Sequence, residues 1–175
     1  MVRVFRDRRD AGVQLARALH PYAEAPDAVV LAHAKNSVPV AYEVATRLAL
    51  PLDVFGAELD DMTPNIDVEN KVVLLVDDGD TARELPRAIE ALRVEGAASV
   101  IVAVAVASPP IWALLLAAAD HVACVLTPQH LFSIEAWYAD LTEPSDSEVR
   151  QLLVTATQNL LLLRRSNFLT RNVDT

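Results

Sequence analysis

The sequence is short of glycine and cysteine and has no excess of basic residues. Its 175 residues include four glycines and a single cysteine, Cys124, which excludes an intramolecular disulfide. A lone cysteine is typical of a reducing compartment, so we expect a cytoplasmic protein. The formal net charge is −9. Because nucleic acids and membrane surfaces are themselves anionic, we expect neither as a partner and expect small molecules or other proteins instead.

Long uncharged apolar segments are also missing. No stretch combines the length needed to cross a membrane with freedom from charge. The N-terminal segment MVRVFRDRRD is charged and has no apolar core, which is unlike a signal peptide. The composition, 53% hydrophobic and 22% charged, is that of a globular protein. We expect one domain over residues 1–175, in which 146–175 form a C-terminal helix and tail.

Short apolar runs alternate with helical patterns along the chain. Runs typical of buried strands cover residues 28–32, 52–55, 71–76, 99–106 and 121–126. Helical patterns cover about 10–21, with Asp10 as the expected cap, then 38–48, 82–95, 109–119 and a long final helix. Such alternation predicts an α/β fold, with a parallel sheet that is covered by helices on both faces. Residues 56–70 are acidic and non-periodic and predict a solvated loop or small flap.

The final helix has more apolar residues than one buried face requires. Ser145 and Glu148 have capping-box spacing and predict its start. A stripe at helical spacing is expected to face the core: Val149, Leu152, Leu153, Ala156, Leu160 and Leu163. Leu161, Leu162, Phe168 and Leu169 fall outside this stripe. Surplus apolar surface needs a partner, and the sequence therefore predicts a homodimer.

The best candidate ligand site follows the central predicted strand, where VVLLV runs into DDGDTARE. Ligands of parallel sheets bind beyond the carboxyl ends of the strands. There, Asp77 and Asp78 can accept bonds from sugar hydroxyls or face Mg²⁺. Gly79 lets the backbone approach a ligand, and the following helix start offers N–H groups to a phosphate. The alternative is a polar strand end that caps the next helix.

Five segments together resemble the type I phosphoribosyltransferases, closest to a bacterial subgroup. They are FRDRRDAGVQLARAL at 5–19, VVLAHAKNSVPVAYEVA at 29–45, VLLVDDGDTARELPRAIEALR at 73–93, PQHLFSIEAWYADL at 128–141 and DSEVRQLL at 146–153. Their order is that of the family. The resemblance implies a five-stranded parallel core with a small hood. It also implies use of phosphoribosyl pyrophosphate and magnesium to make or break a nucleotide N-glycosidic bond.

The resemblance places the ligand on two turns. The implied ligand-binding residues are Lys35, Asn36, Ser37, Asp77, Asp78, Gly79, Asp80 and Thr81. The first three would occupy the pyrophosphate loop, although Lys35 reads equally well as a solvated loop lysine. The paired aspartates would hold the ribose hydroxyls or Mg²⁺, and the rest would form the 5′-phosphate loop. No catalytic residue is assigned.

Four other side chains have two readings each. His33 ends the first predicted strand, where it can serve as a base or as a histidine that is satisfied by its neighbours. Phe132, Trp137 and Tyr138 resemble the family's aromatic segment. One of the three would then stack on a nucleobase, while core packing explains all three about as well.

Three departures from the family pattern predict an eroded active site. Thr81 and Glu84 have capping-box spacing, so the helix is expected to satisfy its own N–H groups and to place Glu84 where a phosphate must sit. Asn36 and Ser37 stand where the subgroup has glycines. Residues 55–70 are too few for the mobile catalytic loop. We therefore expect weak ligand binding, regulation or assembly. The alternatives are an active enzyme completed by a partner chain and a purely structural subunit.

Overall fold

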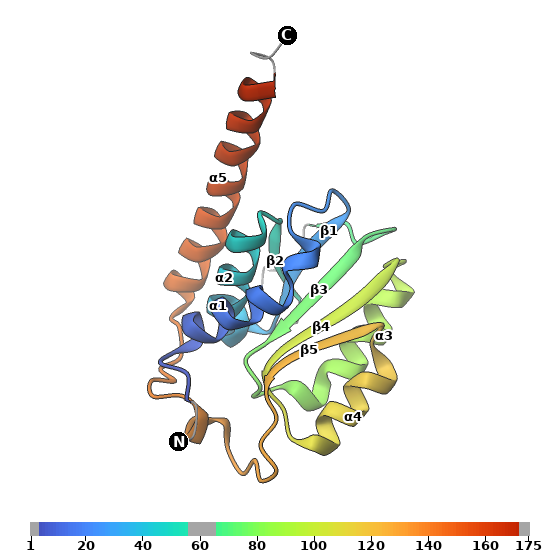
Figure 1. Ribbon diagram of the computed structural model, residues 1–175, viewed down its shortest axis with the longest axis vertical. Helices are drawn as coiled ribbons and strands as arrows, with labels where there is room; N and C mark the ends of the chain where they lie inside the picture. Colours follow the sequence, from blue (N-terminus) through green and yellow to red (C-terminus); the bar gives the residue numbers. More distant parts are fainter. Residues whose placement is uncertain (1–3, 56–65, 172–175) are drawn as a thin grey trace.

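A computed structural model describes residues 4–55 and 66–171 of the chain. Its centre is a five-stranded parallel sheet of order β2-β1-β3-β4-β5 (Figure 1). The strands are β1 Ala28–His33, β2 Leu52–Phe55, β3 Val72–Asp77, β4 Ser99–Val106 and β5 His121–Leu126. The predicted parallel α/β fold is confirmed. The predicted flap at 56–70 lies outside the described residues except for its last five positions.

Helices cover both faces of the sheet (Figure 1). On one face lie α1 Arg8–Ala18, α2 Val38–Leu48 and α5 Asp146–Arg171, and on the other lie α3 Leu85–Val94 and α4 Pro109–Ala118. Side chains of β3 alternate between the two cores, with Leu74 and Val76 facing α1 and α2, and Val73 and Leu75 facing α3 and α4. Because both faces of the inner strands β1, β3 and β4 are buried, these strands read as nearly continuous apolar runs.

Two helix starts differ from the sequence prediction. The cap of α1 is Asp7, whose carboxylate accepts from the Asp10 N–H, so Asp10 lies inside the helix. Residues Ala82–Glu84 form a 3₁₀ turn, and α3 begins only at Leu85. Pro86 explains the second difference, because proline lacks an N–H and is favoured in the first turn of an α-helix.

The final helix starts as predicted. The Ser145 N–H donates to Glu148 Oε2 at 2.9 Å, and the Glu148 N–H donates to Ser145 Oγ at 3.1 Å. Val149, Ala156 and Leu160 are buried, but Leu163 is 46% exposed and was wrongly expected in the core. Leu163 lines a shallow pocket with Ala49 and Leu50 at the edge of the body, which covers only part of it, and the rest of α5 projects from the body (Figure 1). Over the described ranges, no helix is long and apolar enough to cross a membrane.

Candidate functional site

The two predicted turns meet because β1 and β3 are neighbours in the sheet. A cavity of about 280 Å³ lies between them, which we call the turn cavity. Its lining residues are Ala34, Lys35, Asn36, Ser37, Asp78, Asp80, Thr81 and Glu143. Six of the eight predicted ligand residues therefore line one cavity, while Asp77 and Gly79 do not. Its volume is just below the range of small-molecule sites, which begins at roughly 300 Å³.

The Asp77 carboxylate is buried and holds the turn that follows it. Its Oδ1 accepts from the Gly79 N–H at 2.7 Å. Its Oδ2 accepts from the Thr81 hydroxyl and lies 3.0 Å from His33 Nδ1. The same His33 nitrogen lies 2.9 Å from Thr81 Oγ1. His33 is thus a satisfied strand-end histidine, which was one of its two predicted readings.

The Asp78 side chain and backbone tie four segments together. Its Oδ2 accepts from Arg8 Nε at 2.8 Å, and its Oδ1 accepts from the Asp80 N–H at 3.0 Å. Its backbone N–H donates to Ser37 Oγ at 3.1 Å, and its carbonyl accepts from the Tyr138 hydroxyl at 2.7 Å. Asp77 and Asp78 therefore belong to a hydrogen-bond network that also includes His33, Thr81, Arg8, Ser37 and Tyr138.

Arg8 is the residue of this network that the sequence analysis missed. It is only 5% exposed, and its Nη1 donates to the carbonyls of Leu141 and Thr142 at 2.9 Å each. Arg8 thereby fixes the segment before α5 against the end of β3. Helical spacing contained the signal, because Arg8 lies three and seven residues before Ala11 and Leu15, which are both fully buried.

Burial controls the electrostatics of the network. The pKa of Asp78 rises from 3.8 to about 6, because the carboxyl is removed from water and Asp77 lies beside it. The Asp80 N–H and Arg8 oppose this rise. Burial, followed by the charge of Asp78, also raises the pKa of Tyr138 well above its usual range. Tyr138 therefore acts as a neutral donor to Asp78.

The predicted capping box of Thr81 and Glu84 is wrong. The 3₁₀ turn after Thr81 has no side-chain cap, because the Thr81 hydroxyl bonds to Asp77 instead. Glu84 is exposed and is not among the residues that line the turn cavity. Negative charge does surround the cavity, but it comes from Asp78, Asp80 and Glu143.

The unusual backbone of the first turn also lies elsewhere than predicted. Lys35, Asn36 and Ser37 form a 3₁₀ turn, and Ser37 has φ −83°. Ala34 instead has φ 65° and ψ 162°, a conformation that is essentially restricted to glycine. In the second turn, Gly79 has φ +114°, and a Cβ there would lie 2.7 Å from the Val106 carbonyl oxygen. The second turn thus requires glycine, and the first carries strain at Ala34.

The three aromatic residues of segment 128–141, Phe132, Trp137 and Tyr138, have different environments. Tyr138 is buried and packs on Phe5 with ring centroids 5.1 Å apart. Trp137 is half-buried against the core of the α1 and α2 face. Phe132 is 97% exposed, so core packing is wrong for this residue. Its ring is stacked with His130 at 6.4 Å, and nucleobase stacking by Phe132 remains a prediction.

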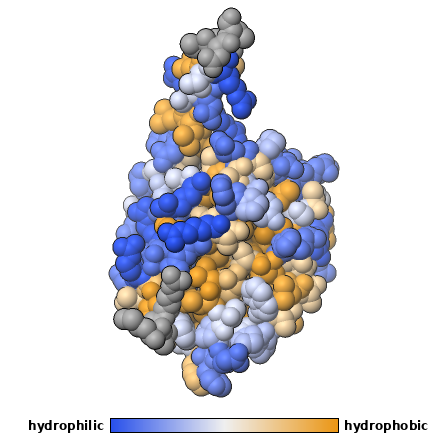
Figure 2. Space-filling view, in the orientation of Figure 1, coloured by the Kyte–Doolittle hydropathy of each residue, from blue (hydrophilic) through white to orange (hydrophobic). Residues whose placement is uncertain are grey.

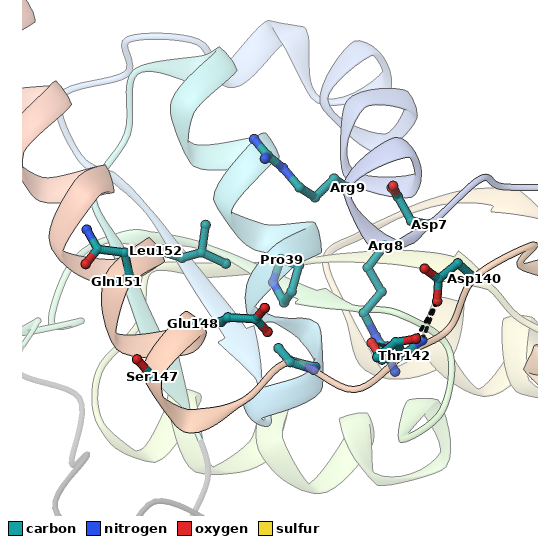
Figure 3. Close-up of a pocket in the computed structure, with 11 residues that line it drawn as sticks. Asp7, Arg8, Arg9, Pro39, Asp140, Thr142, Ser147, Glu148, Gln151 and Leu152 are labelled. Carbon is teal, nitrogen blue, oxygen red and sulfur yellow. Dashed lines mark hydrogen bonds between the residues drawn. The ribbon is translucent and has the colours of Figure 1, made fainter.

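A second cavity, of about 480 Å³, lies on the other side of Arg8. It is formed where the starts of α1, α2 and α5 meet residues 140–144 (Figure 3). Arg8 and Thr142 lie together at one side of it, and Thr142 bonds to Asp140. Asp7, Arg9 and Glu148 also line it, and each of them bonds to a neighbouring part of the protein. Arg8 therefore lines the second cavity and bonds to Asp78, which lines the turn cavity.

Magnesium, which the resemblance implies, finds no ready donor set in these turns. All four carboxylate oxygens of Asp77 and Asp78 already accept a bond or contact within the protein. Across residues 4–55 and 66–171, no group of three or more His, Cys, Asp or Glu residues is placed to hold a metal ion. The described residues therefore do not fit a resident Mg²⁺.

The parallel sheet with this turn at its carboxyl edge defines a phosphoribosyltransferase-type fold. The chain belongs to the phosphoribosyl transferase domain family, which matches residues 10–113. Two curated proteins of Mycobacterium tuberculosis, from strains CDC 1551 and H37Rv, are each 28% identical to it and match 85% of the chain. Both are named "Putative phosphoribosyl transferase". The chain spans about half of their length, since the match covers 46% of each.

Solved structures show the same fold. The protein TT1426 from Thermus thermophilus is 29% identical, with a TM-score of 0.75, and the match covers 87% of this chain and 98% of that one. The APRTase from Giardia lamblia, solved with 9-deazaadenine, is 18% identical with a TM-score of 0.55 and coverage of 70% and 80%. The similarity to the Giardia lamblia protein shows only a shared fold.

Proposed function

We propose that this chain is a phosphoribosyltransferase-like protein with an eroded active site. It binds a phosphoribosyl or nucleotide ligand weakly, or it acts in regulation or assembly. One observation carries the proposal: the N–H groups of Gly79 and Asp80 donate to the carboxylates of Asp77 and Asp78. A sugar phosphate would need these N–H groups, so its binding must first break bonds within the turn.

The charges of the turn cavity support weak binding. Asp78, Asp80 and Glu143 line it, against Lys35, the single cation among its described lining residues. The Lys35 ammonium is itself 2.5 Å from Asp146 Oδ1, and this bond lowers the pKa of Asp146. A phosphate in the cavity would therefore meet three carboxyl groups and a lysine that already has an acidic partner.

The alternative is an active phosphoribosyltransferase. Family membership favours it, as does the convergence of six predicted residues on one cavity. Such an enzyme must close over its substrate, and because residues 55–70 are too few for the mobile loop, a partner chain would have to supply it. A purely structural subunit is the third reading and predicts no small-molecule binding.

The proposal includes a reducing, cytoplasmic setting and a homodimer. Cys124 is partly buried, and burial raises the pKa of its thiol to about 11. Such a thiol is hardly ionised at neutral pH and is poorly reactive, as suits a structural cysteine. The dimer is supported by exposed apolar side chains on α5.

Calorimetry with phosphoribosyl pyrophosphate, with and without Mg²⁺, tests the proposal. The chain has only two lysines, Lys35 and Lys71, so the same substitution at each gives a test variant and a matched control. Lys35→Met removes the cation of the turn cavity, whereas Lys71→Met changes the opposite end of β3. We expect millimolar-range binding that Lys35→Met weakens at least several-fold and Lys71→Met leaves unchanged. Absence of binding to the unmodified protein would favour the structural subunit.

Pyrophosphate release separates the proposal from its alternative. The protein is incubated with phosphoribosyl pyrophosphate, Mg²⁺ and each common nucleobase in turn. The eroded site predicts no release above the protein-free rate. Steady release that depends on one base would establish an active enzyme and reject the proposal.

A further inference from the structure

The outward side of α5 carries a stripe of large apolar residues, which we call the α5 stripe. Its members are Val154, Leu161, Leu162, Phe168 and Leu169, and all are between 51% and 68% exposed. Val154, Leu161 and Phe168 are spaced by seven residues, and so are Leu162 and Leu169. A seven-residue apolar repeat is the pattern by which one helix packs along another.

The body of the same molecule leaves more than half of each stripe residue exposed. The residues by which α5 packs on the body, Val149, Ala156 and Leu160, lie on the other side of the helix. The C-terminal part of α5 projects from the body (Figure 1), and the space-filling view shows apolar side chains on this projecting part (Figure 2). An isolated helical segment of this length is marginal in water, so its stability requires packing against another surface.

A groove for such packing lies at the base of the same helix. A cavity of about 740 Å³ is lined by residues of α5 and of the edge strand β2, and we call it the β2 groove. Its apolar lining includes Leu52, Ile66, Leu153, Val154 and Leu161. Val154 and Leu161 thus belong to both the groove and the stripe. One continuous surface offers an apolar ridge at one end and an apolar groove at the other.

We propose that this surface binds a second copy of the chain, with the two α5 helices antiparallel about a two-fold axis at Leu161. The repeat is symmetric about that residue, because Val154 precedes it by seven positions and Phe168 follows it by seven. The antiparallel arrangement therefore places Phe168 of each copy opposite Val154 of the other. The projecting end of each helix then fills the β2 groove of its partner, as an isologous interface requires.

Charge favours a second copy as the occupant. Residues 149–171 carry four arginines and no acidic residue, a charge of +4, which leaves −13 on the rest of a chain whose total is −9. The charged residues that line the β2 groove are Asp53, Arg150 and Arg164, so the acidic charge that attracts the arginine-rich end of each helix comes from the rest of the other copy and not from the groove. An anionic membrane would attract the arginines but repel the remainder of the molecule.

Sedimentation equilibrium at micromolar concentration tests the interface. The unmodified protein is expected to be a dimer, and Leu161→Glu with Leu162→Glu is expected to be a monomer with unchanged helicity. The matched control is Leu114→Glu with Leu116→Glu on α4, whose side chains are 55% and 52% exposed. This control should remain a dimer. A monomeric unmodified protein, or a control that dissociates while the α5 variant does not, overturns the proposal.

Cysteine cross-linking tests the antiparallel geometry without relying on a destabilising change. In a Cys124→Ser background, Leu161→Cys should form an intermolecular disulfide with itself, because it lies at the two-fold axis. Phe168→Cys alone should not form an intermolecular disulfide. A mixture of Phe168→Cys and Val154→Cys should form one between the two variants. Self-linking of Phe168→Cys would indicate parallel helices and contradict the proposal. Binding of the monomer to phosphatidylserine vesicles through α5 would show that a membrane, and not a second copy, occupies this surface, and would contradict the proposal.

Discussion

The turn at residues 77–81 and the projecting end of α5 differ in how their side chains are satisfied. In the turn, the carboxylates bond to Gly79, Asp80, Thr81 and Arg8 within the same molecule. On α5, apolar side chains such as Phe168 remain exposed. The polar groups of the turn are thus bonded within the molecule, while the apolar residues of the α5 stripe are more than half exposed. The family's ligand position and this chain's unsatisfied binding surface lie in different places.

Removing the buried cation of the turn should have the largest effect. Arg8→Met leaves Asp78 without its charged partner and two carbonyls without a donor, which should lower the free energy of unfolding by about 3–5 kcal/mol. Urea denaturation measures this change. The neighbouring Arg9→Met removes a 58% exposed side chain and should cost about 1 kcal/mol or less. Equal losses for the two variants would show that the network does not stabilise the turn.

The second-largest loss of stability is expected when a methyl group is added at the centre of the turn. Gly79→Ala places Cβ 2.7 Å from the Val106 carbonyl in a left-handed conformation, and we expect a loss of about 3 kcal/mol. Gly96→Ala is the control, because Gly96 also has positive φ (+88°) but meets only the flexible Glu69 side chain at 3.2 Å. It should cost about 1 kcal/mol. Thermal unfolding of both variants compares them, and a smaller loss at Gly79 would contradict the close approach.

The stability of the turn should also depend on pH. The folded pKa of Asp78, about 6, lies above its unfolded value of 3.8, so the folded state binds the proton more tightly. The contribution of Asp78 to stability is therefore greatest below about pH 4 and is lost as the pH rises through about 6. The free energy of unfolding is measured for the unmodified protein and for Asp78→Asn between these limits. As the pH rises, the value for the unmodified protein should fall relative to the value for Asp78→Asn. A difference that is independent of pH would mean that Asp78 is not perturbed.

The smallest effect is expected at the first turn. Ala34→Gly removes the strain of a positive φ and should raise the free energy of unfolding by about 1 kcal/mol. Ala113→Gly, at an exposed position of α4, should instead lower the free energy of unfolding, because glycine within a helix costs about 1 kcal/mol. Chemical denaturation distinguishes the two. A loss of stability in Ala34→Gly would place the strain elsewhere.

Local patterns predicted most of the elements but only part of the site. The bounds of α2, β2, β4 and β5 agree with the sequence prediction, because apolar runs and Pro39 mark them directly. Arg8 and Tyr138 were missed as partners of Asp78 because they are 70 and 60 residues away along the chain. Only the strand order and the packing of α1 against the sheet bring them together.

The capping prediction failed for a related reason. Spacing alone suggested that Thr81 bonds to its own helix, but the end of β3 offers Asp77 as a buried acceptor that competes for the same hydroxyl. The strain at Ala34 was equally hidden, because nothing in the sequence distinguishes this alanine from its neighbours. Both features depend on contacts between turns, which local periodicity does not contain.

Amide hydrogen exchange at Gly79 and Asp80 tests most directly whether the turn satisfies its own donors. In the ligand-free protein, these two N–H groups should exchange as slowly as amides of the central strand β3, because Asp77 and Asp78 accept their bonds. Addition of phosphoribosyl pyrophosphate with Mg²⁺ at submillimolar concentration should leave them protected. Rapid exchange in the free protein, followed by strong protection on addition of the ligand, would contradict the account.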